Sequence, residues 1–413
     1  MIRISHPHIT TTQEDVAKLS ATLDVDGKMY ELWFSVSAQY GKYLCDERSD
    51  AFVLGVFYFA MCHGHDIIAE APMTDRLYWQ LTDQFFLPFS KLNNLSRNSA
   101  DVERGIGYKV NISCPIAPEI KHPDGGENVG TGISCGVDSL HVFATHKEIT
   151  HACIWHAHAM TGIPEMDTPA LHDIAWNGMR ERALSFAREV GIELVIGDTN
   201  FAQGCMPGLQ WDGMTTFGNL FCIFALQKFW KCYYVASDCD IMNFGMKMRS
   251  LNQDPARWEY FLFPHLSLSN LSVYMDGQAH FRVEKVREII DYPPAQKYLN
   301  VCWRIREGHQ NGTNDCPKCM HTLLDLEVFD AVDKFKNVFD VKYYHSHFHE
   351  YLAEYYRRYL QKDNFALELK PYMDMRKYPL SIRLKAWLIV LRKAIKKIMR
   401  GGKTRHGRFS SKG

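Results

Sequence analysis

Acidic residues are missing from the last part of the chain. From Met375 to Gly413 the sequence contains thirteen Lys or Arg and no Asp or Glu, although all 413 residues together carry 47 basic and 47 acidic side chains. The rest of the protein therefore has 34 basic residues against 47 acidic ones. The net charge is zero because a basic C-terminal segment balances an otherwise acidic chain.

Long apolar runs are absent as well. No window reaches the roughly eighteen apolar residues that a membrane span requires, and the first residues lack an apolar run of signal-peptide length. The twelve cysteines are spread along the chain, whereas small secreted domains concentrate theirs in a disulfide framework. We therefore expect a cytoplasmic protein whose cysteines are mostly free core thiols. Apolar residues at 46% and aromatic residues at 13% argue against global disorder.

The length permits two domains, or one large domain with extensions. The segment Lys121–Gly132 is rich in glycine and reads as a loop, which places a boundary near residue 120. We expect an N-terminal α+β domain over residues 1–120 and a second domain over 121–330. A helical extension over 331–400 and a disordered basic tail over 401–413 would follow.

Apolar patterning alternates between strand and helix in the second domain. Helices are predicted from Ser139, over Pro169–Val190 and over Met214–Trp230, and Gly191 closes the second of them. Short apolar strands are predicted between and after these helices, at Ala152–His156, Ile192–Ile196 and Cys232–Ala236. Such alternation implies parallel strands with right-handed crossovers, so we expect a doubly wound parallel α/β sheet.

The stretch GTGISCGVDSLHVFA, residues 130–144, leads from a strand-like segment into a helical one. Backbone N–H groups at such a turn form a concave anion site, strengthened by the helix dipole. Gly136 would let the backbone approach a phosphate closely, and Ser134 and Ser139 could donate hydroxyl hydrogen bonds to it. Asp138 would repel a bare phosphate, so it fits beside a magnesium ion or as a helix cap. An ordinary capped turn is the alternative.

The hexapeptide SCGVDS resembles the SGGxDS signature of the PP-loop ATP pyrophosphatases, a superfamily with a Rossmann-like (adenine nucleotide alpha hydrolase-like) fold. The resemblance covers roughly residues 128–330 and implies a loop that holds the pyrophosphate of ATP beside Mg²⁺. Ser134, Gly136, Asp138 and Ser139 match the signature, and Val137 takes its variable position. Cys135 departs from it because most members have glycine there. A Cβ at that position could crowd the phosphate or expose a thiol.

Two further strand ends would complete the nucleotide site. Trp155 and His156 end the strand where the resemblance implies backbone contacts to adenine, although His156 could equally be a surface or capping histidine. Ser237 and Asp238 follow the strand that ends at Ala236, where Asp238 could hold magnesium, orient the substrate or cap a turn.

A cysteine cluster follows the α/β pattern. Cys316 and Cys319 form a C-x-x-C turn, and Cys302 lies fourteen residues upstream. A tetrahedral zinc site needs four ligands, so His309 or His321 would supply the last one. Unliganded thiols are the alternative. This arrangement resembles the zinc-binding end of the queuosine-precursor (7-cyano-7-deazaguanine) synthases, which supply four cysteines, and still more that of uncharacterised PP-loop proteins.

Upstream of these cysteines, the segment from Asp276 also fits the sequence of such relatives. There Arg282 and Lys285 could neutralise a phosphate of ATP or a carboxylate of the substrate. Solvated helix charges are the alternative.

The segment Leu384–Met399 combines an apolar side with Lys and Arg. Such a helix suits an anionic membrane surface or an acidic partner, and it could equally pack on the acidic remainder of this protein. Membrane contact would place the protein at the inner face of the membrane. No zinc-finger spacing or aromatic-basic motif accompanies the segment, which disfavours nucleic acid as the partner.

Together these features predict an ATP-dependent ligase or amidotransferase. It would activate a carboxylate or carbonyl oxygen of a small-molecule substrate as the adenylate, release pyrophosphate, and let a nitrogen nucleophile displace AMP. Asp138, Ser139, Arg282 and Lys285 would be its catalytic residues. The alternatives are an ATP-binding sensor or scaffold without turnover, and a sulfur-transfer enzyme with a persulfide on Cys316 or Cys319. Either would act in a glycan or specialised-metabolite pathway. The protein could also be a homo-oligomer.

Overall fold

The computed structural model describes residues 1–11, 15–83, 110–157, 168–201, 211–237, 241, 259–302, 311 and 316–399. The chain forms two compact units. The first consists of Met1–Ile133 and His146–Gln278, and the second of Ser134–Thr145 and Ala279–Gly413. The predicted boundary near residue 120 falls inside the first unit, and the one at residue 330 falls inside the second.

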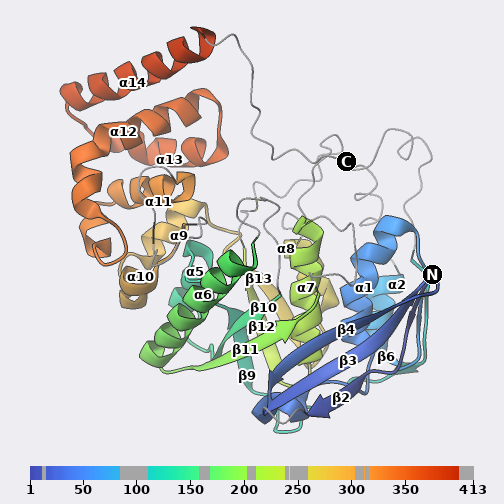
Figure 1. The fold of residues 1–413 in the computed structure, drawn as a ribbon. Helices are drawn as coiled ribbons and strands as arrows, with labels where there is room; N and C mark the ends of the chain where they lie inside the picture. Colours follow the sequence, from blue (N-terminus) through green and yellow to red (C-terminus); the bar gives the residue numbers. More distant parts are fainter. Residues whose placement is uncertain are drawn as a thin grey trace. The chain divides into compact units, whose positions relative to one another are not determined.

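Five parallel strands form one side of the large sheet in the first unit, with β13 at its edge. Their spatial order is β13–β12–β9–β10–β11, with bounds Ser272–Asp276, Trp230–Ala236, Asn128–Gly132, His151–His156 and Glu193–Thr199. The first of these strands in the chain, β9, lies in the middle, and the chain proceeds outward from it in both directions (Figure 1). This order confirms an α/β structure with a mostly parallel sheet, and it is compatible with the predicted doubly wound fold.

The N-terminal strands extend this same sheet. Strand β4 pairs antiparallel with β11 along Phe34–Val36, which covers the edge that β11 would otherwise expose. The other strands follow in the order β3, β1, β5 and β7, and β2 also pairs with β3. Their bounds are Lys28–Ser37 for β4, Val16–Val25 for β3, Ile2–Ile4 for β1, Ile67–Ala69 for β5, Ile112–Ser113 for β7 and His8–Thr11 for β2. Strands β6 (Met73–Thr74) and β8 (Ile116–Ala117) form a separate two-stranded sheet. The predicted N-terminal α+β part therefore shares its main sheet with the α/β part.

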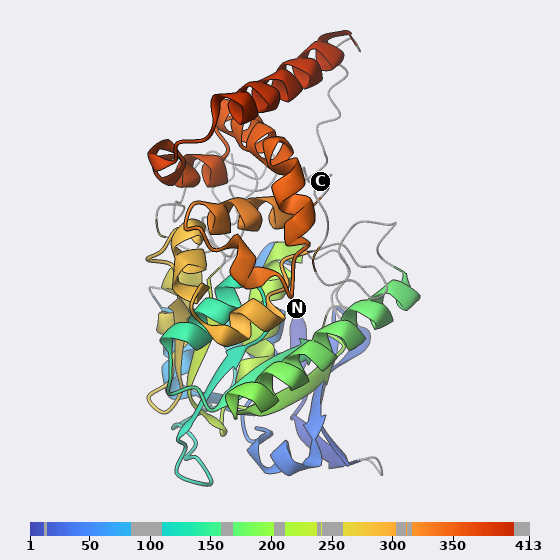
Figure 2. The same ribbon diagram turned by 90° about the vertical axis from the view of Figure 1, so that its left-hand side faces the viewer.

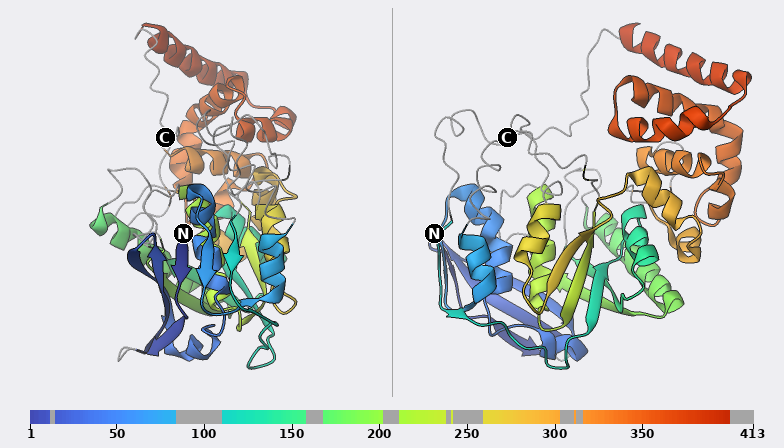
Figure 3. Two further views of the ribbon diagram at one scale, coloured as in Figure 1. Left: turned by 90° about the vertical axis from the view of Figure 1, so that its right-hand side faces the viewer. Right: turned by 180° about the vertical axis from the view of Figure 1, so that it is seen from behind.

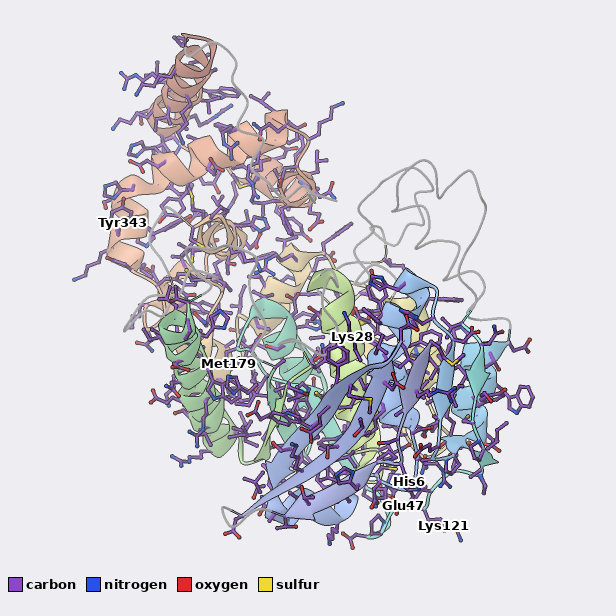
Figure 4. All side chains as sticks on the ribbon, turned by 45° about the vertical axis from the view of Figure 1, so that its right-hand side comes forward. His6, Lys28, Glu47, Lys121, Met179 and Tyr343 are labelled. Carbon is purple, nitrogen blue, oxygen red and sulfur yellow. The ribbon has the colours of Figure 1, made fainter. Side chains whose placement is uncertain are left out.

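Helices cover the sheet of the first unit. Figure 2 shows α6 (Pro169–Val190) lying across β10 and β11, and Figure 4 labels Met179 on this helix. Helix α7 (Trp211–Ala225) packs on α1 (Asp50–His63), as the view from behind in Figure 3 shows. Their contact is aromatic, because the ring of Phe221 lies 5.4 Å from that of Phe52. The described part of this unit also contains three shorter helices: a 3-10 helix (Ala38–Tyr43), α2 (Asp75–Thr82) and α8 (Glu259–Leu266).

The predicted helix over Pro169–Val190 is confirmed at both ends. Thr168 accepts a hydrogen bond from the N–H of Leu171, and Gly191 ends the helix in the left-handed conformation.

Two local predictions are wrong. The expected loop Lys121–Gly132 contains the central strand β9, and Trp230 belongs to β12 rather than to the preceding helix. The first error has a steric cause. A Cβ on Gly130 would lie 2.8 Å from the Trp230 ring, so β9 needs a residue without a side chain at this position. Glycine is typical of loops, which is why the sequence predicted a loop here.

The second unit is helical. After α5 (Val137–Thr145) it contains α9 (Arg282–Ile289), α10 (Pro293–Tyr298), α11 (Pro317–Glu327), a 3-10 helix (Val332–Phe335), α12 (Val341–Leu360), α13 (Asn364–Met375) and α14 (Leu380–Met399). Figure 4 labels Tyr343 on α12. Helix α5 packs on α9, α9 on α11, and α12 on both α13 and α14. Among the described residues, every helix is too short or too polar to cross a lipid bilayer.

Candidate functional site

The loop between β9 and α5 is held in an unusual backbone conformation. Cys135 has a φ of 57°, in the left-handed region that favours glycine. Its carbonyl oxygen accepts a hydrogen bond of 2.7 Å from the N–H of Asn300, and its side chain is 1% exposed. The departure from glycine that the sequence shows therefore neither exposes a thiol nor leaves the loop unsupported.

Hydroxyl groups line the turn that follows. The hydroxyl of Ser134 accepts a hydrogen bond of 3.2 Å from the N–H of Gly136 and lies 3.2 Å from the hydroxyl of Ser139. Ser139 also donates to the carbonyl oxygen of Gly136. Gly136 accepts the first hydrogen bond of the helix, from the N–H of Leu140, so the first N–H groups of α5 have no acceptor within the helix. Ser134 is exposed and could redirect its hydroxyl to a bound anion.

Asp138 contacts two cations from α9. Its Oδ1 lies 2.9 Å from Nζ of Lys285, and its Oδ2 lies 3.4 Å from Nη1 of Arg282. The Lys285 side chain is only 3% exposed, so this is a largely buried ion pair. Burial raises the pKa of Asp138, but the charges of Lys285 and then Arg282 outweigh it and hold that pKa below its usual value. The carboxylate is thus ionised, and the three groups together carry a net positive charge beside the loop.

A second polar layer lies one turn farther along the same two helices. His141 follows Asp138 on α5 and Glu288 follows Lys285 on α9, each by three residues. Nε2 of His141 lies 2.7 Å from one Glu288 oxygen, and Nε2 of His280 lies 3.1 Å from the other. These three side chains lie close enough together to hold a metal ion, and the short contact between His141 and Glu288 also joins α5 to α9. The sequence analysis missed this group.

Arg282 links the loop to the cysteine cluster. Its Nη1 contacts Asp138, and its Nη2 lies 3.4 Å from the hydroxyl of Thr322 on α11. Thr322 is fully buried and donates in turn to the carbonyl oxygen of Lys318. The guanidinium fork therefore spans two helices that are distant in the sequence.

Three cysteines converge at the start of α11. The Sγ atoms of Cys302, Cys316 and Cys319 lie within 4.8 Å of one another, and Cys316 and Cys319 are fully buried. Hydrogen bonds from the other two thiols lower the pKa of Cys316, so one sulfur of the group favours the thiolate form. Sulfur ligands of a tetrahedral zinc ion stand about 3.8 Å apart. The cluster is therefore compatible with zinc, as the sequence predicts.

Of the two predicted candidates for the fourth ligand, His321 is not part of this cluster. Nε2 of His321 lies 3.5 Å from Oδ1 of Asp325, and its ring packs on Phe365. Burial lowers the pKa of His321 and raises that of Asp325 to about 8, so both side chains favour their neutral forms. His309, the other predicted ligand, lies outside the described residues.

The remaining predicted site residues belong to the first unit. Trp155 and His156 do end β10, and His156 stacks on Trp176 with Nδ1 at 3.5 Å from Asp198. Ser237 is buried, and its N–H donates to the carbonyl oxygen of Asp276. Asp238 lies outside the described residues.

No family model, no curated protein and no solved structure matches this chain.

Proposed function

We propose that this protein is an ATP-dependent adenylating enzyme that forms AMP and pyrophosphate, as the PP-loop resemblance implies. The observation that carries the proposal is the cation pair at the loop. Lys285 and Arg282 meet beside the first turn of α5, where N–H groups and the Ser134 hydroxyl are also available. An anion with several oxygens, such as pyrophosphate, matches this combination of charge and donors.

The loop residues have separate roles in this proposal. N–H groups at the start of α5 would bind phosphate oxygens, and the Ser134 hydroxyl would donate to one of them. Ser139 is 5% exposed and already donates to Gly136, so it would position the turn. The backbone N–H of Val137 could serve as a donor, but its side chain is buried in the core. These groups would stabilise negative charge on the departing pyrophosphate, with only the Ser134 hydroxyl turning towards it.

Asp138 would act mainly by positioning Lys285 and Arg282. Both of its oxygens are engaged by these cations, so Mg²⁺ would have to displace one of them. When ATP is bound, Mg²⁺ would supply charge neutralisation between the phosphates. Asp138 would in either case keep two positive charges close to the reacting phosphate.

A zinc ion on Cys302, Cys316 and Cys319 would have a structural role. It would fix the start of α11 and thereby the Thr322 hydroxyl that contacts Arg282. The burial of Cys316 and Cys319 disfavours the sulfur-transfer alternative, since a persulfide must reach its acceptor. The substrate would be a small molecule whose carboxylate or carbonyl oxygen attacks the α-phosphate, with a nitrogen nucleophile then displacing AMP.

Nucleotide binding and product analysis test this proposal. ATP and inorganic pyrophosphate should compete for one site, measured by calorimetry. The Ser134→Ala variant should bind both roughly tenfold more weakly, because it loses a hydrogen bond to a charged group. The Ser346→Ala variant removes another exposed hydroxyl, on α12, and should bind as the wild type does.

With a metabolite extract as the source of acceptors, ATP labelled at the α-phosphate should yield labelled AMP, accompanied by pyrophosphate. Competitive binding without AMP formation would favour the sensor alternative. Failure of both ATP and pyrophosphate to bind would refute the nucleotide site itself.

A further inference from the structure

Helix α14 exposes a continuous apolar stripe. Five aliphatic side chains recur along it at three- and four-residue spacing, which places them on one face of the helix. Their exposed fractions lie between 53% and 67%: Leu380, Leu384, Leu388, Leu391 and Ile395. Trp387 borders the stripe and is 37% exposed. Single exposed apolar residues are ordinary, but a contiguous row of this length indicates a surface that contacts something else.

The packing of α14 within the second unit does not use this stripe. Ala386 and Val390 are buried, 0% and 8% exposed, and α14 packs on α12. The Trp387 ring stacks on that of Tyr356 at 4.8 Å between centroids, with an angle of 14° between the planes. Figure 1 shows α14 beside α12, where it is the last helix of the chain. The helix is thus anchored through one face while the leucines remain on another.

Basic side chains accompany the stripe. Five basic side chains of α14 are exposed together with the leucines: Arg383, Lys385, Arg392, Lys393 and Lys396. Lys385 and Arg392 adjoin Leu384 and Leu391 in the sequence. No acidic residue occurs on α14 or anywhere from Met375 to Gly413, so no intrahelical ion pair neutralises these charges.

We propose that α14 docks on an anionic lipid surface, with its leucine stripe in the acyl boundary and its Lys and Arg side chains at the headgroups. A helix of 20 residues is about 30 Å long and can lie in the plane of the interface over its whole length. Trp387 and its neighbours on α14 pack on α12, so the stripe can reach a lipid surface while the unit stays folded. This inference does not depend on the proposed ATP chemistry.

A lipid surface fits the side chains better than other polyanions do. A surface that binds nucleic acid has basic side chains at its centre, where they contact the phosphates. The centre of the exposed face of α14 is aliphatic instead, so its leucines would lie against the phosphates. An acidic groove on another protein, or a second copy of α14, would also accept the leucines. Two copies of α14, however, would bring two basic helices together, and their like charges repel. A bilayer containing anionic lipid satisfies both the apolar stripe and the charge.

Vesicle flotation with the full chain tests the proposal. The protein should float with phosphatidylcholine vesicles that contain about 30% phosphatidylserine and stay unbound with phosphatidylcholine alone. About 1 M salt should reduce the bound fraction severalfold. The Leu384→Glu/Leu388→Glu variant should lose binding by at least about a hundredfold, because two aliphatic anchors become anions facing a negative surface.

The control is Leu360→Glu/Leu367→Glu, which changes two comparably exposed leucines on α12 and α13 by the same charge. It should bind vesicles as the wild type does, and both variants should keep the wild-type melting temperature. Three results would overturn the proposal. These are equal binding of the two variants, equal binding to charged and uncharged vesicles, and a dimer in sedimentation that only the Leu384/Leu388 variant dissociates.

Discussion

The buried ion pair between Asp138 and Lys285 yields the sharpest stability prediction. Breaking a buried pair from one side typically costs about 3–5 kcal/mol, because a charge is left without its partner. Here the Asp138 side chain is 24% exposed and Arg282 remains at 3.4 Å, so we expect Lys285→Met to cost only about 2 kcal/mol. Asp138→Asn should cost more, about 3 kcal/mol, since it leaves a Lys285 that is 3% exposed beside a second cation.

The double variant separates the energy of the Asp138–Lys285 interaction from the other effects of each single substitution. Asp138→Asn with Lys285→Met removes both charges, so its cost should not exceed that of Asp138→Asn alone. The coupling energy between the two positions should therefore be about 2 kcal/mol. Hydrogen exchange of the α5 and α9 amides is the suitable assay, because a chain of two units need not unfold in one step.

The pH dependence gives an independent check of the same pair. A carboxyl whose pKa is lowered in the folded protein contributes stability above its unfolded pKa of about 4, and that contribution is lost as the pH falls through the lower folded value. Lys285→Met should weaken this acid-dependent loss, and Asp138→Asn should abolish it. A coupling energy below about 0.5 kcal/mol, together with identical acid profiles, would refute the reasoning.

Substitutions at two further positions test strain and burial in the second unit. Cys135→Gly should be as stable as Cys135→Ala or up to about 1 kcal/mol more stable, since glycine avoids the cost of the positive φ; urea unfolding in which Ala is the more stable would contradict this. The lowered pKa of His321 contributes stability that rises with pH, so the wild type is compared with Asp325→Asn, which keeps that contribution. Relative to Asp325→Asn, the wild type should lose stability as the pH rises from about 4 towards the raised pKa of Asp325, by up to about 1.4 kcal/mol per pH unit. Parallel pH profiles of the two proteins would show that Asp325 is ionised in the fold.

Local rules account for what the sequence predicted correctly. The helix Pro169–Val190 has a threonine cap before it, proline at its first position and a glycine after it, so its ends follow from short-range chemistry. The alternation of elements likewise predicted parallel pairing, because a strand that follows a crossover helix returns in the same direction. The convergence of Cys316 with Cys319 follows from their spacing alone, whereas that of Cys302 required the tertiary fold.

Tertiary contacts account for what the sequence could not predict. Strand β9 contains Gly130 and Gly132, and nothing in its own residues indicates that Trp230 will lie over it. The role of Asp138 is a second example. Its neighbours in the sequence suggest a helix cap or a magnesium ligand, but its partners lie about 150 residues away on α9. The periodicity of apolar residues predicts helices and strands, but it does not predict which side chains of distant helices will contact each other.

The two informative motifs of this sequence meet at one side chain. The loop motif supplies Asp138, the cysteine motif positions Thr322, and Arg282 contacts both through the two arms of its guanidinium. A lysine at position 282 could not bridge them in this way, because it offers a single charged nitrogen rather than a planar fork. The cysteine cluster is therefore in a position to influence the charge beside the loop without touching any ligand. A zinc ion bound to the cysteines would thus act on the loop only through Thr322 and Arg282.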